Sequence, residues 1–234
     1  MQRLMVKAAL GLWLGFAGAL AAQTPPAVVV ELYTSQGCSS CPPADAFLAD
    51  LADDPSVLAL ALHVDYWDYI GWADSFADPK FTERQKSYAH AAGSKTIYTP
   101  QFIIGGDARV VGHDPGAVAA QIVDLMQRGG SVQLWLKREG DLVSIRAEAV
   151  KPLTGLMRVQ LVRYEPQQLV DIATGENAGH KITYRNIVTS WLSLGNWDGR
   201  GDFVAKAPAG GDQPIAVIVQ TDGFGPILAA ARIP

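Results

Sequence analysis

Cys38 and Cys41 are the only cysteines of the 234-residue chain, and they stand three positions apart. Two thiols at this spacing can form a disulfide, exchange it with other thiols, or bind a soft metal ion. A disulfide that closes so short a loop stabilises a fold only slightly, because this stabilisation grows with loop length. The pair is therefore better explained by chemistry than by structural support.

The segments around the two cysteines predict a strand, a helix and a second strand. Residues 28–33 and 57–64 are short apolar runs, which is typical of buried parallel strands. Residues 39–52 carry a helical apolar stripe, and Pro42 and Pro43 fit a helix only in its first turn. The cysteine pair is predicted to lie at the N-terminus of this helix, inside a βαβ unit.

This position suits thiol–disulfide exchange. The thiolate is the attacking species, and the positive end of a helix lowers the pKa of a nearby thiol. We expect Cys38 to be the exposed nucleophile and Cys41, one turn further on, to be the resolving thiol. The redox-active disulfide would then be the only cofactor, and the partners would be protein or small-molecule thiols and disulfides.

Two other classes of function remain open. Two thiolates suit Cu(I), so Cys38 and Cys41 could form the metal site of a copper-handling protein. Alternatively, the chain is a non-catalytic exported binding module with a vestigial CxxC pair.

Four further residues near the pair could contribute. Glu31, inside an apolar strand, could be a buried acid that moves the proton of the second cysteine, could pair with a buried base, or could point outward. Tyr66 and Trp67 belong to an aromatic-rich stretch that could line a substrate groove or fill the core. His63 is expected to be a hydrogen-bonded core histidine.

The remainder of the first half predicts two helices and a hairpin. Asp78 and Pro79 are typical of a helix start, and Gly93 of its end. Residues 101–111 predict a hairpin, and residues 114–129 predict a final amphipathic helix. This order indicates an α/β domain with a helical insertion.

The second half has a different pattern. From Ser131 apolar residues alternate with polar ones, and strands are predicted between Gly- and Pro-rich loops. Such a run indicates an antiparallel β-sandwich-like module. We therefore predict two domains, residues 22–129 and 130–234. The polar loop 174–180 could face the cysteine pair or be a plain connection.

Residues 28–129 resemble the thioredoxin-like superfamily in the βαβ unit with CxxC and in Thr99-Pro100 before the hairpin. The resemblance implies that the Thr99–Pro100 peptide bond is cis and that Pro100 lies against the active disulfide, where Thr99 and Pro100 would contact substrate. The chain departs from that pattern at Gly37, where thioredoxins usually carry an aromatic residue.

The chain also resembles a family of exported proteins known as domain of unknown function 1223. The shared motifs are TSQGCSSCPPAD at residues 34–45, YTPQ at 98–101 and GENAG at 175–179. This resemblance spans nearly the whole chain but implies no established activity.

The first 21 residues have the pattern of a secretory signal peptide. Arg3 and Lys7 precede an apolar run over residues 8–20, and residues 19–21 match a cleavage site. We therefore expect a periplasmic or secreted protein. Without Arg3 and Lys7 the chain has 17 basic and 23 acidic residues, a net charge of −6. This charge and the lack of a basic run disfavour nucleic acid or a membrane surface as partner.

Overall fold

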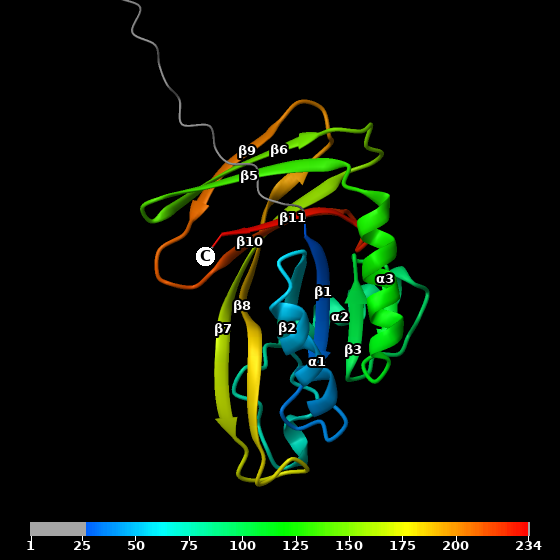
Figure 1. Ribbon diagram of the computed structural model, residues 1–234, viewed down its shortest axis with the longest axis vertical. Coiled ribbons are helices and arrows are strands. Elements are labelled where there is room, and N and C mark those ends of the chain that lie inside the picture. The colour runs from blue at the N-terminus through cyan, green and yellow to red at the C-terminus, as the bar shows by residue number, and fades with distance from the viewer. Residues whose placement is uncertain (1–26, 234) are drawn as a thin grey trace, which may run out of the picture.

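Two β-sheets and three α-helices form the part of the chain that the computed structural model describes, residues 27–233 (Figure 1). The predicted signal peptide, residues 1–21, lies outside the described residues. The helices are α1 (Pro42–Ala52), α2 (Pro79–Ala91) and α3 (Pro115–Arg128), with a short 3-10 helix, η1 (Asp68–Ile70). The strands are β1 (Val28–Thr34), β2 (Val57–His63), β3 (Gln101–Ile104), β4 (Ala108–Val111), β5 (Val132–Glu139), β6 (Leu142–Ala149), β7 (Met157–Asp171), β8 (Lys181–Trp197), β9 (Phe203–Pro208), β10 (Ile215–Thr221) and β11 (Ile227–Ile233).

The βαβ unit around the cysteines forms as predicted. β1 and β2 are parallel neighbours, and β3 pairs antiparallel with the other edge of β1. Pro42 and Pro43 occupy the first turn of α1, where their missing N–H groups need no partner within the helix. The helix begins at Pro42, three residues later than predicted, because Ser39 and Ser40 form a turn.

The helix predicted from Asp78 is also confirmed. Asp78 is the N-cap of α2, and its carboxylate accepts a hydrogen bond from the Lys80 N–H. Asp114 caps α3 in the same way, through the Ala117 N–H. Among residues 27–233, no helix has the length and apolar character needed to cross a membrane.

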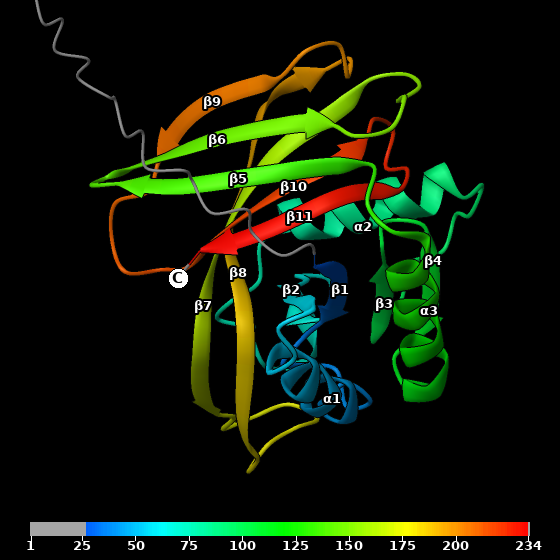
Figure 2. The ribbon, with the colours of Figure 1, turned by 45° about the horizontal axis from the view of Figure 1, so that its top comes forward.

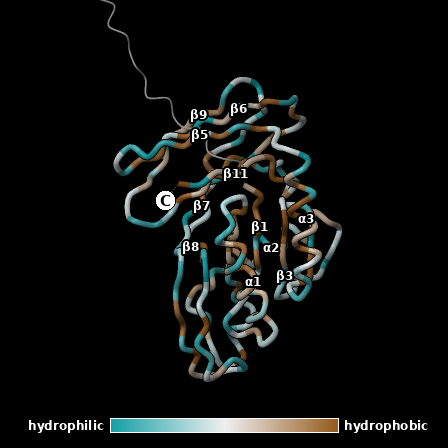
Figure 3. Tube along the Cα trace, viewed as in Figure 1, coloured by the Kyte–Doolittle hydropathy of each residue, from teal (hydrophilic) through white to brown (hydrophobic). Residues whose placement is uncertain are grey.

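The two faces of β1 pack against different helices. Val30 and Leu32 share an apolar cluster with α1, whereas Val29 and Tyr33 share another with α2. α1 and α2 therefore lie on opposite sides of the sheet (Figure 1). The hydropathy colours of Figure 3 are mostly apolar along β1 and β3, because both faces of these strands are covered. A residue of β1 can contact the cysteine pair only if it lies on the α1 face of the strand.

The larger sheet crosses the boundary predicted near residue 129. Its strand order is β11-β10-β7-β8-β2-β1-β3-β4, and β8 meets β2 in parallel at Ile187 and Ala61. The two predicted segments thus share one eight-stranded sheet instead of having separate sheets. This junction brings the loop between β7 and β8 towards the end of β1.

Part of the second half forms a sheet of its own. β5, β6 and β9 form a separate antiparallel sheet that lies over β10 and β11 (Figure 2). Apolar residues of β5 and β6 share one core with those of β7 and β10. The alternation along β5 is that of a strand with one buried face, for which Val132, Leu134 and Leu136 point inward.

Candidate active site

Cys38 and Cys41 form a disulfide between β1 and α1. Cys41 is the N-cap of α1, and Cys38 lies one turn earlier. The Cys38 N–H donates to the Ser35 carbonyl at 3.1 Å, and the Cys41 N–H donates to the Cys38 carbonyl at 3.1 Å. The predicted position, between a strand and a helix N-terminus, is confirmed.

The expectation that Cys38 is exposed is wrong. Cys38 is 1% exposed and Cys41 is 0% exposed, although the intervening Ser39 and Ser40 are exposed. The serines form the surface of the turn, and the sulfurs lie beneath them. Exchange at this disulfide therefore requires the turn or its neighbours to open.

The N-terminus of α1 offers a thiolate fewer free N–H donors than expected. Pro42 and Pro43 have no N–H, and the N–H groups of Ala44 and Asp45 both donate to the Cys41 carbonyl. The Ser40 hydroxyl, whose Oγ is 3.4 Å from the Cys38 Sγ, is instead placed to donate to this sulfur. Ser40 is thus a site residue that the spacing of the cysteines alone did not reveal.

Asn177, in the loop between β7 and β8, holds the cysteine turn. Its buried Nδ2 donates to the Gln36 and Cys38 carbonyls, both at 2.9 Å. The Thr174 hydroxyl donates to the Gly71 carbonyl at 2.6 Å, so the loop also holds the aromatic segment. Of the two alternatives for residues 174–180, the loop facing the pair is the one observed.

Replacing Asn177 with alanine is expected to loosen the turn. The loss of two hydrogen bonds to buried carbonyls costs about 1–3 kcal/mol. If opening limits access to Cys38, alkylation of the reduced protein should accelerate about tenfold for each 1.4 kcal/mol lost. The rate of iodoacetamide labelling measures this effect. Asn196→Ala removes an exposed asparagine of β8 and is the control. Equal labelling rates in the two variants would contradict the role of Asn177.

Trp67, in the aromatic-rich stretch after β2, packs beside the cysteine turn. Its Nε1 donates to the Thr99 Oγ1 at 2.6 Å, next to Pro100, and the Thr99–Pro100 bond is cis as predicted. A Cβ added at Gly37 would lie 3.3 Å from the Cβ of Trp67. Trp67 therefore occupies the space beside Gly37, and a side chain at position 37 would crowd it. The predicted contact of Pro100 with Cys38 stays a prediction.

Tyr66 is half-buried and donates to the Gln85 Oε1 at 3.2 Å. Burial raises the pKa of Tyr66 to about 12, so its hydroxyl remains protonated at neutral pH. Both Tyr66 and Trp67 pack against the apolar cluster beside α2. Their contacts match the core interpretation, and the substrate role predicted for them stays a prediction.

The role predicted for Glu31 is wrong. Glu31 is fully buried, but its carboxylate accepts from Arg84 at 2.7 and 2.9 Å and from the hydroxyls of Tyr88 at 2.7 Å and Tyr33 at 3.0 Å. These partners lie on the α2 side of β1, whereas Cys41 is the N-cap of α1, which packs against the other face. The alternative that Glu31 pairs with a buried base is the one observed.

A different acidic residue lies on the buried face of α1, one turn after Cys41. Asp45, 3% exposed, follows Cys41 by one turn of α1, and neither oxygen of its carboxylate has a hydrogen-bond partner among residues 27–233. His63 Nε2, Thr34 Oγ1 and the Tyr184 hydroxyl are also buried without a partner in the described part of the chain. We refer to Thr34, Asp45, His63, Asp74 and Tyr184 as the Asp45 cluster.

His63 is held within this cluster. Its Nδ1 lies 2.7 Å from the Asp74 Oδ2, which also accepts from the Gln36 N–H at 2.8 Å. The ring of Tyr184 meets that of His63 edge-on, with centroids 4.9 Å apart. His63 is thus a hydrogen-bonded core histidine, as expected. Gln36 joins the cluster to the turn that Asn177 holds.

The charge state of Asp45 depends on its surroundings. Burial raises the pKa of Asp45 to about 7, and Asp74 contributes in the same direction. His63 opposes this shift, as does the Thr34 hydroxyl, which lies nearby but beyond the geometry of a regular hydrogen bond. The sequence contained one indication of Asp45, because position i+4 from Cys41 lies on the same face of a helix.

The comparisons with known proteins address the chain as a whole. Residues 29–220 match the family described as protein of unknown function, DUF1223. The chain belongs to the DUF1223 family. The matched range of this DUF1223 protein includes both cysteines, Asp45 and Asn177. No curated protein matches it.

Two solved structures are similar to the DUF1223 chain over most of its length. A crystal structure of a protein from Agrobacterium tumefaciens is 34% identical, with a TM-score of 0.78, and the match covers 91% of this chain and 96% of that one. The structure of HBP35 of Porphyromonas gingivalis is 15% identical, with a TM-score of 0.62, and the match covers 90% of this chain and 75% of that one. The second likeness concerns the fold alone.

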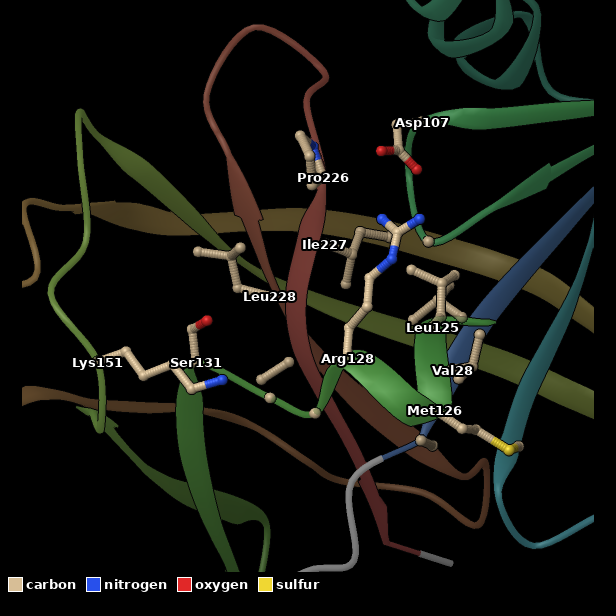
Figure 4. Close-up of a pocket in the computed structure, with 16 residues that line it drawn as sticks. Val28, Asp107, Leu125, Met126, Arg128, Ser131, Lys151, Pro226, Ile227 and Leu228 are labelled. Carbon is tan, nitrogen blue, oxygen red and sulfur yellow. The ribbon is translucent and has the colours of Figure 1, made fainter. Parts of the chain in front are cut away.

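A pocket of about 370 Å³ in the DUF1223 chain lies away from the cysteines (Figure 4). Leu125, Ile227 and Leu228 line it together with Arg128. Val28, at the start of β1, also contributes, whereas the cysteine turn follows the opposite end of that strand. The pocket therefore does not belong to the disulfide site.

Asp45 should make the stability of this DUF1223 protein depend on pH. Its pKa is about 7 in the folded state and 3.8 in a model peptide, so folding favours the protonated form. The associated stability is present below about pH 4 and is lost as the pH rises to about 7. The three-unit difference corresponds to a loss on the order of 4 kcal/mol.

Asp45→Asn should remove this dependence and stabilise the protein at neutral pH relative to the parent. Urea unfolding of both proteins across this pH range measures the difference in the free energy of unfolding. Other carboxylates titrate in both proteins and cancel in the difference. If the free energy of unfolding changed with pH equally in the parent and in Asp45→Asn, Asp45 would not titrate as described.

Proposed function

We propose that this protein is an exported, periplasmic or secreted, thioredoxin-like oxidoreductase that exchanges disulfides with protein or small-molecule thiols through Cys38 and Cys41. The observation that carries the proposal is the setting of the disulfide. It bridges only three positions at the junction of β1 and α1, with the Ser40 hydroxyl at one sulfur and the polar Asp45 cluster behind the helix. A disulfide kept for stability has no need of these groups.

The arrangement of the surrounding elements supports the thioredoxin-like part of the proposal. β1, α1 and β2 form a parallel βαβ unit, and β3 and β4 extend the sheet antiparallel beyond β1. The cysteine pair lies where the first strand leads into the first helix, which is the place that the superfamily resemblance implies.

In the proposed reaction a substrate thiolate attacks the Sγ of Cys38. The bond between Cys38 and the substrate forms as the Cys38–Cys41 bond breaks, and Cys41 leaves as a thiolate. A second substrate thiolate then displaces the reduced protein, so that two substrate thiols become one disulfide. In the opposite direction the Cys38 thiolate attacks a substrate disulfide, and Cys41 releases the reduced substrate.

Turnover of a disulfide-linked fluorescent peptide, and oxidation of the corresponding dithiol peptide, test the proposal in both directions. Turnover above the uncatalysed rate in either direction, lost in Cys38→Ser, is the expected result. Titration of the reduced protein with Cu(I) is the parallel assay. Tight Cu(I) binding without turnover would overturn the proposal in favour of copper handling, and the absence of both activities would favour a binding module.

A further inference from the structure

Reduction of the disulfide creates a problem of charge at Cys41. Cys41 is 0% exposed, so a Cys41 thiolate would form away from bulk solvent. A buried anion is costly unless a donor or a proton stabilises it. The start of α1 offers little help, because Pro42 and Pro43 lack N–H groups and the next two N–H groups donate to the Cys41 carbonyl. A nearby side chain that can give up a proton would remove this cost.

Asp45 is the titratable side chain on the buried face of α1 behind Cys41. Residues four apart on a helix lie one above the other, and the Asp45 N–H donates to the Cys41 carbonyl at 3.0 Å. Both residues are buried, and both oxygens of the Asp45 carboxylate lack a partner within residues 27–233. A buried carboxyl without a hydrogen bond does not stabilise the fold, so its presence points to a chemical role.

We propose that Asp45 is the proton donor and acceptor for Cys41. This inference rests on the proposed exchange function. When a substrate thiolate breaks the disulfide, Cys41 leaves as a thiolate and takes the proton of the Asp45 carboxylic acid. In the reverse direction the Asp45 carboxylate accepts the Cys41 proton. The resulting thiolate attacks Cys38 of the mixed disulfide, and the substrate leaves as a thiolate.

Groups from every element around Asp45 face it. His63 of β2 and Thr34 of β1 favour the carboxylate, whereas Asp74, before α2, disfavours it. Tyr184 of β8 lies close enough for Asp45 to raise its pKa, although burial is the main cause of that shift. The balance leaves the pKa of Asp45 near neutrality. A proton donor and acceptor works best when its pKa lies near the working pH.

The test is a single-turnover experiment on the full chain. The reduced protein is mixed with excess oxidised glutathione, which forms a mixed disulfide at Cys38. The later, concentration-independent release of glutathione reports the attack by Cys41. In Asp45→Asn this step should be at least about tenfold slower near neutral pH, and the difference should vanish at high pH, where Cys41 ionises without a base.

Asp50→Asn, which changes an exposed carboxylate of the same helix, is the matched control and should follow the parent. Identical pH–rate profiles of Asp45→Asn and Asp50→Asn would overturn the proposal. The measurement needs no physiological substrate. If the protein turned over no peptide substrate but the glutathione-release step still depended on Asp45, the proposed function would be refuted and the role of Asp45 would not.

A second measurement keeps the proposal testable if Asp45→Asn does not fold. Carbon-13 NMR of the parent chain follows the Asp45 carboxyl in the disulfide and dithiol forms. Coupling to the Cys41 proton should shift the Asp45 midpoint by about one pH unit or more between the two forms. His63→Gln should move the midpoint upward in both. A midpoint that is equal in the two redox forms would contradict the proposal.

Discussion

Replacing Cys38 with serine is expected to reduce disulfide exchange by at least about a thousandfold, because it removes the attacking sulfur. Cys41→Ser should instead accumulate mixed disulfides at Cys38, because the resolving thiol is lost. The roles follow from position. Cys38 lies in the turn below the exposed serines, with the Ser40 Oγ 3.4 Å from its sulfur, whereas Cys41 is the N-cap of α1.

Mass spectrometry of each variant after incubation with oxidised glutathione and with a disulfide-linked peptide measures the trapped species. Ser39→Ala, which changes an exposed residue of the turn with no hydrogen bond to either sulfur, is the control. Trapping by Cys38→Ser, with Cys41→Ser inert, would reverse the assigned roles.

The second large effect concerns stability and not exchange. Arg84→Met is expected to lower the free energy of unfolding by about 3–5 kcal/mol, because it leaves the fully buried Glu31 carboxylate without its charge partner. The guanidinium also lies 3.7 Å from the centroid of the Trp191 ring, a contact that methionine replaces only in part. Urea unfolding of the parent and the variant measures the loss.

The double variant Glu31→Gln/Arg84→Met should recover much of that stability, because the uncompensated charge is gone. Lys86→Met on the same helix removes the exposed pair with Glu83 and should cost less than about 1 kcal/mol. Because the Glu31 partners lie on the α2 side of the sheet, folded Arg84→Met should retain disulfide exchange. If Arg84→Met lowered the free energy of unfolding no more than Lys86→Met does, the pair of Glu31 and Arg84 would not stabilise the fold as described.

The features predicted correctly from the sequence depend on local chemistry. Proline in a first helical turn, aspartate as an N-cap and apolar runs as buried strands are set by residues within a few positions of one another. Pro42 and Pro43 begin α1, and Asp78 caps α2, as those local rules require. The position of the cysteine pair follows from the same rules.

Apart from Ser40 and Asp45, which lie close to the cysteines in sequence, the features that were missed depend on contacts between distant residues. Glu31 pairs with Arg84, 53 positions away, so the face on which its partner lies could not be inferred from β1 alone. Asn177 reaches the Cys38 carbonyl from 139 positions away, across the junction of β8 with β2. The predicted boundary near residue 129 failed to anticipate this junction, because alternation identifies strands and not their neighbours.

The redox activity of the cysteine pair can be measured by equilibrating the protein with graded mixtures of reduced and oxidised dithiothreitol and counting the Cys38 and Cys41 thiols by alkylation. We expect a reversible two-electron transition between the disulfide and the dithiol, with the fold retained in both forms by circular dichroism. The midpoint gives the reduction potential, which decides whether the protein reduces or oxidises its partners. A disulfide that is reduced only when the protein is unfolded would contradict a role in disulfide exchange.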